Sequence, residues 1–375
     1  MKVELNCSAF AEAVSWAARI IPTKPAVPVL SGIKLEASQD SLHLSVFDYE
    51  KSARNEIAAQ TEETGTVVVA GKLLESIAKL MPGETVTLTS SGSNLTVESG
   101  KSKFTLQLMP ESEYPQLPEI PKEAGQVDAD TFANAVSQVS VAAAKDETRP
   151  VLASVRMEFK KDEIILTSTD RYRLAQARFK WTPTDPDIDA MILISGSTLK
   201  DISRTFDIHQ NISFGFDAEK PNIISFSNAG RISTVQIIEG EFPQVEKLLA
   251  LKHPIEAVVE RKTLIGALRR ASIVADTGTQ TAVWLTFSSD ELSIVSGEAG
   301  DSQATEAIKA DLDGDGIRIG FNPAFLLEGL NAINEPYLRF KVTDPTTLAQ
   351  INGQQEADSD NSEDYTYIIV PVREM

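Results

Sequence analysis

The sequence predicts an α+β protein made of three repeated domains, each with two helices packed on antiparallel sheets. Two observations lead to this prediction. The segment FAEAVS at 10–15 returns as FANAVS at 132–137, and PVLSGIKLE at 28–36 returns as PVLASVRME at 150–158, both offset by 122 residues. Helix-like and strand-like stretches also alternate along the whole chain. Matching blocks in one register are typical of an internal repeat.

A fainter third copy follows the first two. Residues 264–268 are similar to the block that begins at Phe132, and residues 283–291 are similar to 155–163. Proline-containing segments at 109–125 and 238–254 separate the copies, because proline interrupts regular structure. The predicted domains are residues 1–122, 125–250 and 255–375.

Six stretches carry apolar residues at the i, i+3, i+4 spacing of an amphipathic helix. They are residues 10–20, 71–81, 132–145, 197–206, 262–275 and 322–333. Between them, alternating segments such as SLHLSV (41–46), EIILTST (163–169) and YLRFKV (337–342) predict antiparallel strands with one buried face. Because the helices begin 60 to 65 residues apart, each domain contains two similar halves that cover each other's apolar faces. Such repeats, joined head to tail, close into a ring or continue as a filament.

Bulk composition narrows the class of protein further. A chain of 375 residues with 42% hydrophobic content fits two or three globular domains. A single cysteine, Cys7, excludes a disulfide framework and favours the reducing cytoplasm. The first ten residues lack an apolar core, and no stretch reaches 18 apolar residues, so we expect neither a signal peptide nor a membrane span.

Charge is segregated along the chain. The formal net charge is −19, yet the six predicted helices carry +5 and the remainder therefore −24. Lys72 and Lys79 share one helix face, as do Lys200 and Arg204, because of their spacing. Ordinary solvated helix faces would give this pattern. A basic wall that faces a polyanion, through phosphate contacts without sequence information, would give it too.

Catalytic motifs are missing from the sequence. It has no Walker loop, HExxH or GxSxG, and its three histidines are scattered. The triplet at 276–278, Asp-Thr-Gly, has no second copy, whereas aspartic proteases need two carboxylates. Residues 311–316 imitate an EF-hand loop, but position 12 is Asn322 instead of Glu, which favours a surface turn. We therefore expect no enzyme, no metal and no cofactor.

Two further stretches carry a family resemblance. TDRYRLA at 169–175 and the terminal YTYIIVPVREM at 365–375, together with the threefold repeat, resemble the bacterial sliding clamp, the beta subunit of replicative DNA polymerase III. The resemblance covers essentially the whole chain. It implies three DNA-clamp domains in each protomer and a head-to-tail homodimer that closes as a ring around duplex DNA without sequence preference. It also implies a processivity factor that a clamp loader opens, and that tethers the replicative polymerase and other proteins carrying a clamp-binding motif.

The resemblance assigns roles to residues in three sets. The partner-peptide groove would comprise Leu152, Thr169, Arg171, Tyr172, Arg173, Leu174, Pro243, Leu248, Thr346, Val370, Pro371, Val372 and Arg373. The DNA-facing cations would be Lys24, Lys72, Lys79, Lys145, Arg149, Lys200, Arg204, Arg269 and Arg270. The dimer contact would pair Phe104 of one protomer with Ile273 and Val274 of the other.

Some positions depart from the family pattern. Arg171-Tyr172 stands where the family often has Gly-His or Ser-His, and Val370 and Val372 replace two methionines of the tail. Valine is shorter and stiffer than methionine, so we expect a different peptide preference. The composition of EADSDNSED at 356–364 is typical of a flexible acidic loop. The alternative hypothesis is an acidic peptide-binding scaffold that does not engage DNA.

Overall fold

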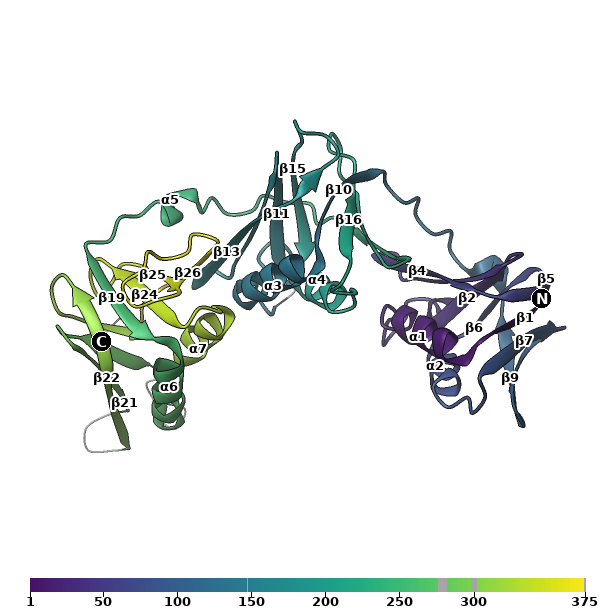
Figure 1. Ribbon diagram of the computed structural model, residues 1–375, viewed down its shortest axis with the longest axis horizontal. Coiled ribbons are helices and arrows are strands. Elements are labelled where there is room, and N and C mark those ends of the chain that lie inside the picture. Colours follow the sequence, from purple (N-terminus) through teal and green to yellow (C-terminus); the bar gives the residue numbers. More distant parts are fainter. Residues whose placement is uncertain (147, 276–281, 298–301, 374–375) are drawn as a thin grey trace. The chain divides into compact units, whose positions relative to one another are not determined.

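A computed structural model describes residues 1–146, 148–275, 282–297 and 302–373 of the chain (Figure 1). The chain forms two compact units. The first unit comprises residues 1–129, 182–185 and 205–237. The second unit comprises residues 130–181, 186–204 and 238–375.

The first unit contains one sheet of 14 strands and two helices. In sheet order the strands are β14 (Thr182–Pro183), β10 (Glu123–Asp128), β16 (Asn211–Gly215), β17 (Ile223–Asn228), β18 (Arg231–Gln236), β4 (Lys51–Ala58), β3 (Ser41–Phe47), β2 (Gly32–Ala37), β6 (Gly65–Ala70), β9 (Ser102–Met109), β8 (Asn94–Ser99), β7 (Thr85–Ser91), β1 (Lys2–Asn6) and β5 (Gln60–Glu63). The helices α1 (Cys7–Ala17) and α2 (Gly71–Ala78) lie side by side (Figure 1).

In its described residues, the second unit contains one sheet of 12 strands. In sheet order they are β15 (Asp189–Ser195), β11 (Ser154–Lys160), β12 (Glu163–Thr169), β13 (Arg173–Lys180), β26 (Tyr365–Ile369), β25 (Ala349–Gln354), β24 (Tyr337–Val342), β19 (Ile255–Glu260), β22 (Gln303–Asp313), β21 (Glu291–Gly297), β20 (Val283–Phe287) and β23 (Ile317–Phe321). Its helices are α3 (Ala129–Val139), α4 (Gly196–Ser203), α5 (Glu246–Leu249), α6 (Arg261–Ala275) and α7 (Pro323–Ala332).

All six predicted helices are present, and each follows a strand directly or, in the case of α7, after one residue. The strand–helix pairs are β1–α1, β6–α2, β10–α3, β15–α4, β19–α6 and β23–α7. Polar caps help to start several of them: the side chains of Asn6, Ser195 and Asn322 accept hydrogen bonds from the first turns of α1, α4 and α7. The short helix α5 was not predicted. It lies in the Pro-containing segment after β18.

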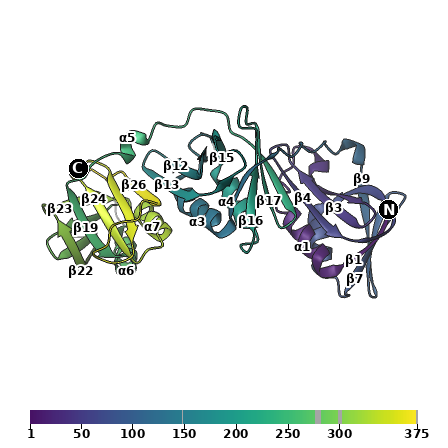
Figure 2. The same cartoon turned by 45° about the horizontal axis from the view of Figure 1, so that its top comes forward.

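The two sheets divide the strands of the middle repeat between them. Strand β18 pairs antiparallel with β4 of the first repeat, in a register that joins Arg231 to Asn55. Strand β13 pairs antiparallel with β26 of the third repeat, in a register that joins Arg173 to Ile369. Figures 1 and 2 show β13 and β26 side by side in the second unit. Each sheet therefore continues from one repeat into the next. The boundary between the two compact units runs through the middle repeat, and does not coincide with a boundary between the predicted repeats.

The predicted strand alternation produces the expected one-sided burial. In β3, Leu42, Leu44 and Val46 are fully buried, while the residues between them are partly exposed. They belong to the hydrophobic core of the first unit, which Phe10 and Val14 of α1 complete. Alternate side chains point to opposite faces of a strand, so the period-two pattern places one set inside.

The acidic segment 356–364 is held against neighbouring strands. The Gln354 side chain donates to the carbonyl oxygens of Glu356 and Ala357, at 2.8 and 2.9 Å. The Arg339 guanidinium donates to the Ser359 carbonyl at 3.0 Å. These contacts tie the start of the segment to β24 and β25.

Replacing either of two helical glycines by alanine should change the stability of the protein, in opposite directions at the two positions. In α7, a Cβ on Gly329 would lie 2.2 Å from the ring of the fully buried Tyr367. Overpacking of this kind costs about 1–3 kcal/mol, so we expect Gly329→Ala to lower the thermal midpoint. In α6, a Cβ on Gly266 would meet only Arg270, at 3.6 Å. Gly266→Ala should therefore add up to about 1 kcal/mol through helix propensity. Calorimetry of both variants checks this pair, and a gain in stability by Gly329→Ala would contradict the packing described.

Candidate functional site

A tight turn between β12 and β13 presents the residues of the TDRYRLA motif. The Asp170 carboxylate accepts hydrogen bonds from the amides of Tyr172 and Arg173, both at 3.0 Å. The Thr169 hydroxyl donates to the Arg173 carbonyl at 2.8 Å. Arg171 adopts a left-handed conformation, with φ of 80°. Aspartate and threonine side chains that bond to nearby backbone stabilise such turns, which explains this residue order.

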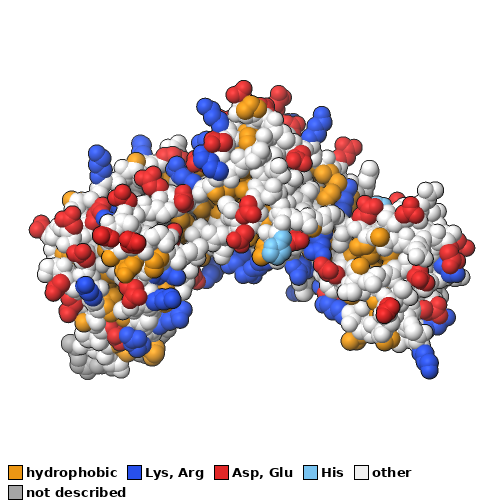
Figure 3. All heavy atoms as spheres, in the orientation of Figure 1, with side chains coloured by type: hydrophobic (Ala, Val, Ile, Leu, Met, Phe, Trp, Pro, Cys, Tyr) orange, Lys and Arg blue, Asp and Glu red, His pale blue; other side chains and the backbone are white. Residues whose placement is uncertain are grey.

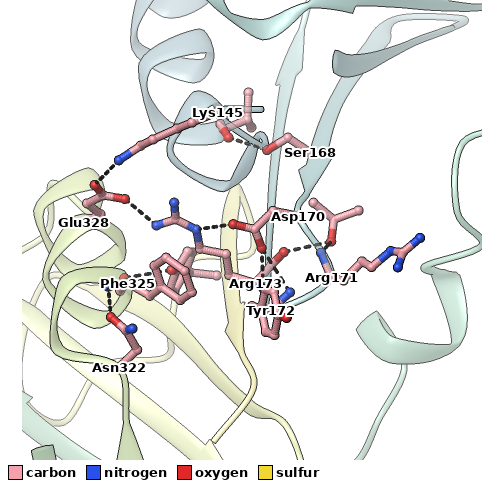
Figure 4. A network of polar contacts seen from close by, with 12 residues as sticks. Lys145, Ser168, Asp170, Arg171, Tyr172, Arg173, Asn322, Phe325 and Glu328 are labelled. Atoms are coloured by element: carbon pink, nitrogen blue, oxygen red, sulfur yellow. Dashed lines mark hydrogen bonds and ion pairs between the residues drawn. The ribbon is translucent and has the colours of Figure 1, made fainter. Parts of the chain in front are cut away.

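Arg173 occupies the centre of a polar network at this turn (Figure 4). Its side chain is only 2% exposed. Its Nε donates to Asp170 at 2.9 Å, and another guanidinium nitrogen donates to Glu328 of α7. The guanidinium also lies over the ring of Phe325, 4.3 Å from the centroid. A buried charge needs such partners, so these contacts hold Arg173 in one place.

The network joins the turn to α7 and to the loop after α3. The second carboxylate oxygen of Glu328 accepts from Lys145 at 3.1 Å. Burial opposes ionisation of Glu328, but the hydrogen bonds from Arg173 and Lys145 outweigh it and hold the pKa of the carboxyl below its usual value. Glu328 therefore carries its charge at neutral pH between two cations.

An apolar cluster lies beside the turn. Leu174 of β13, Leu193 of β15 and Ile368 of β26 pack with Phe242 and Val245 of the segment after β18. Further apolar residues pack against this cluster at its margin: Val151, Ile238, Leu249 and Leu348. Two aromatic rings lie near the turn, with Tyr172 and Phe325 6.2 Å apart between centroids. Tyr172 is 62% exposed, so apolar surface is available to a ligand.

Arg156 of β11 anchors the connecting segment to the sheet. Its guanidinium pairs with Glu246 of α5 and with Glu158, both at 3.0 Å. It also lies 5.0 Å from the ring centroid of Phe242. Arg156 thus fixes the segment that supplies one side of the apolar cluster. Sequence reasoning missed this residue, although the repeat places Lys34 at the equivalent position of the first copy.

The C-terminal tail crosses from β26 to β23. The Val370 amide donates to the Tyr172 carbonyl at 2.8 Å, and the Val372 amide donates to the Gly320 carbonyl at 2.8 Å. Beside the tail is a hollow of about 570 Å³. It is lined in part by Thr346, Val372 and Arg373, over Trp284. Three of the predicted groove residues therefore gather here, and others gather at the turn.

The predicted groove residues differ in exposure. Five are buried: Leu152, Thr169, Arg173, Leu174 and Pro371. Two are half-buried: Pro243 and Val370. Six are exposed: Arg171, Tyr172, Leu248, Thr346, Val372 and Arg373. All belong to the second unit, so that unit by itself contains the complete predicted set.

The predicted DNA-facing cations lie at the surface, and several have acidic partners. Eight are exposed and Lys200 is half-buried. The Glu75 carboxylate is shared by Lys72 at 3.2 Å and Lys79 at 2.8 Å. Arg270 forms two hydrogen bonds to Glu306, at 2.8 and 2.7 Å. In the second unit, Figure 3 shows Lys and Arg side chains over α6 and along the margin of α3 and α4.

The predicted dimer residues are also accessible. Ile273 of α6 is 69% exposed, and Phe104 of β9 is 40% exposed. Val274 is half-buried. In the described part of the chain, residues 102–107 of β9 pair with β8 alone, and only 108–109 reach β6. The first part of β9 is therefore a sheet edge.

Two stretches of the sequence imitate catalytic or metal-binding motifs, and the structure describes only the second of them. Residues 276–278 lie outside the described residues. Residues 311–316 form the end of β22 and a turn in which Gly314 has φ of 112°, as the surface-turn interpretation predicts. Within the ranges that the structure describes, no cluster of three His, Cys, Asp or Glu could hold a metal ion. In those same ranges, every helix is too short or too polar to span a membrane.

Comparisons with known proteins match all three repeats. Residues 1–118, 126–244 and 246–373 match the N-terminal, central and C-terminal domains of the DNA polymerase III beta subunit. The beta sliding clamp of Streptomyces coelicolor is 40% identical over 375 residues, which is all of this chain and 99% of that protein. The beta sliding clamp of Bacillus subtilis is 28% identical over the full length of both proteins. A crystal structure of the Bacillus subtilis DNA polymerase sliding clamp superposes with a TM-score of 0.93, at 25% identity and full coverage of both chains.

These matches, together with the repeated α+β fold, define the class of protein as a sliding clamp. The chain belongs to the family of the DNA polymerase III beta subunit. Its function is that of a DNA polymerase processivity factor in replication.

Removing the charge of Asp170 should destabilise the turn. Asp170→Asn keeps an acceptor oxygen for the two amides but loses the ion pair with the buried Arg173. We expect a loss of about 1–3 kcal/mol in the free energy of unfolding, measured by urea denaturation. The matched control is Asp162→Asn, which breaks the well-exposed pair with Lys180 and should leave the midpoint unchanged. Equal midpoints for wild type and Asp170→Asn would refute the role given to Asp170.

Proposed function

We propose that two copies of this chain close head to tail into a ring around duplex DNA, and that the ring tethers the replicative polymerase. The observation that carries this proposal is the segregation of charge, with +5 on the six predicted helices of a chain of net charge −19. A clamp loader would open the ring, and other proteins with a clamp-binding motif would share the groove. We place the domain boundaries at 1–122, 125–250 and 255–375, and the protein in the cytoplasm.

The DNA-facing surface would be formed by the nine cations assigned above. Exposed Lys and Arg side chains bind phosphates without reading sequence, which suits a ring that slides. Acidic neighbours such as Glu75 and Glu306 already occupy some of these cations. A phosphate must compete with them, so each contact would be weak and readily exchanged. The strongly acidic remainder of the chain would discourage DNA from binding elsewhere.

The partner-peptide groove would lie at the turn and the C-terminal tail. The buried cluster around Leu174 and Phe242 offers an apolar floor, and the exposed Tyr172 and Leu248 offer walls. The exposed Arg171 and Thr346 supply polar groups that would orient a short linear peptide, while the buried Arg173 holds the turn in place. The chain would bind its partners and carry out no catalysis.

The dimer contact would use the open edge of β9. An unpaired edge invites a strand or helix from another chain, and the exposed Phe104 and Ile273 add apolar area. An interface between unlike surfaces closes into a ring only when the rotation between copies permits it. The three similar domains in each copy would provide that regular rotation.

Neutralising cations on the helices should reduce DNA retention. We expect the alanine variant of Lys72, Lys79, Lys200 and Arg204 to load and remain on circular duplex DNA less well than the wild type. The plot of log affinity against log salt concentration should become less steep, by about 0.9 for each phosphate that the variant no longer neutralises. Retention on circular versus linear DNA, measured by gel filtration of the complexes, checks this and separates a clamp from a scaffold that does not engage DNA.

A matched variant controls for overall charge. Alanine at four exposed lysines outside the predicted helices and outside β9 removes the same charge: Lys122, Lys160, Lys180 and Lys220. It should retain DNA like the wild type. Equal retention by the helix variant and the wild type would overturn the assignment of the cations.

Charges at the predicted interface should separate the copies. The wild type should have a solution mass of about 82 kDa, twice the 40.8 kDa of the chain. Ile273→Glu combined with Val274→Glu should shift the mass to that of one chain, because a charge buried in an apolar contact is costly. Light scattering at micromolar concentration measures both. Ile208→Glu, at an exposed position outside the predicted contact, should leave the mass unchanged, and an unchanged mass for the double variant would contradict the interface.

A further inference from the structure

One carboxylate connects two residues with different assignments. Glu328 of α7 accepts from Lys145 through one oxygen and from Arg173 through the other (Figure 4). Lys145 is assigned to DNA and Arg173 to the partner-peptide groove. The two cations come from different parts of the middle repeat, and Glu328 comes from the third. Sequence reasoning assigned no role to Glu328.

The position of Arg173 determines the shape of the turn beside the groove. Its guanidinium stacks on Phe325, whose ring neighbours that of Tyr172. Its Nε holds Asp170, which in turn accepts the amides of Tyr172 and Arg173. A change in how firmly Glu328 holds Arg173 therefore reaches the aromatic wall and the backbone of the turn. Glu328 acts through Arg173, so its role is one of positioning.

The bond from Lys145 is the exchangeable part of this network. The Lys145 side chain is 82% exposed, whereas that of Arg173 is 2% exposed. Exposed ion pairs contribute little and are screened by salt, so a phosphate can take the place of Glu328 as the partner of Lys145. The pair between Glu328 and the buried Arg173 does not exchange in this way, because separation would leave the buried guanidinium without one of its partners.

We propose that Glu328 couples DNA contact at Lys145 to the affinity of the partner-peptide groove. This inference rests on the proposed function for the assignment of Lys145 to DNA and of Arg173 to the groove. When a phosphate takes Lys145, the Glu328 carboxylate is left to Arg173 alone. The competing cation is then gone, so Glu328 holds Arg173 more firmly and the groove wall is better ordered. A clamp on DNA would thus bind partner peptides more tightly than a free clamp, and peptide binding would favour DNA contact by the same factor.

A double-mutant cycle tests the coupling without any DNA. The full-length protein, its Lys145→Met and Glu328→Gln variants, and the double variant are titrated with a fluorescein-labelled peptide taken from the replicative polymerase. Lys145→Met imitates the removal of the cation, so it should tighten peptide binding about twofold to fivefold, the range that an exposed ion pair commands. Glu328→Gln should weaken binding. In the Glu328→Gln background, Lys145→Met should have no effect, because its route to Arg173 is missing.

Three controls separate positioning from general effects. Lys145→Arg keeps the charge and should behave like the wild type. Glu75→Gln removes a carboxylate that is likewise shared by two cations, Lys72 and Lys79, neither of which belongs to the groove. It should change DNA retention yet leave the peptide affinity unchanged. Thermal unfolding shows whether the Glu328→Gln variant is folded at the temperature of the titration. If it is unfolded, Glu328→Asp, which keeps the charge, takes its place.

The DNA arm compares peptide affinity for the free protein and for protein loaded on circular duplex DNA. Tighter binding on DNA for the wild type, but not for Glu328→Gln, is the expected result. Equal effects of Lys145→Met in both backgrounds would overturn the role of Glu328, whatever the DNA result. A non-additive cycle with no effect of DNA would overturn the link to DNA. Failure of the wild type to stay on circular DNA would instead count against the proposed function.

Discussion

The pairing of sheet edges between repeats is the constraint on which the rest of the structure depends. A sheet edge exposes unpaired backbone groups, and a half-repeat of about 60 residues cannot cover its own apolar face. Here β18 of the middle repeat pairs with β4, and β13 pairs with β26. Each contact extends one sheet over two repeats. The same constraint leaves the first part of β9 as an edge, and this edge is the one that the proposed dimer contact would use.

Edge pairing also explains where the candidate groove forms. Because β13 and β26 are neighbours, the turn that precedes β13 meets the tail that follows β26. The Val370 amide bonds to Tyr172 at this junction, and α7 lies close enough for Phe325 to cover Arg173. The site therefore needs residues from two repeats, and its geometry depends on the register of one strand pair.

Much of the fold could be predicted from the sequence, but only part of the site. Period and repeat carry information about local structure, so all six helices were placed and the strands matched in type. Glu328 and Arg156 were missed because their partners are distant in sequence, as with Arg173 and Glu328, which are 155 residues apart. A lone Glu on an amphipathic helix gives no local sign of such a partner. For Arg156 the sequence does offer one signal, because the repeated block has a basic residue at the same position in both copies, Lys34 and Arg156.

Several of the predicted DNA-facing cations are paired with carboxylates, and this pairing affects how strongly they could bind DNA. If strong DNA binding were the requirement, carboxylates such as Glu75 and Glu306 beside the basic residues would be unfavourable, because each neutralises part of the attraction. A protein that must stay on DNA by enclosing it needs no strong contact, and strong contacts would slow its movement. Shared carboxylates hold the cations in place, and in the proposed role they would reduce the strength of any one phosphate contact. On this view Glu328 differs from Glu75 in its partners: Glu75 is shared between two surface lysines of its own helix region, whereas Glu328 joins a distant surface lysine to a buried arginine.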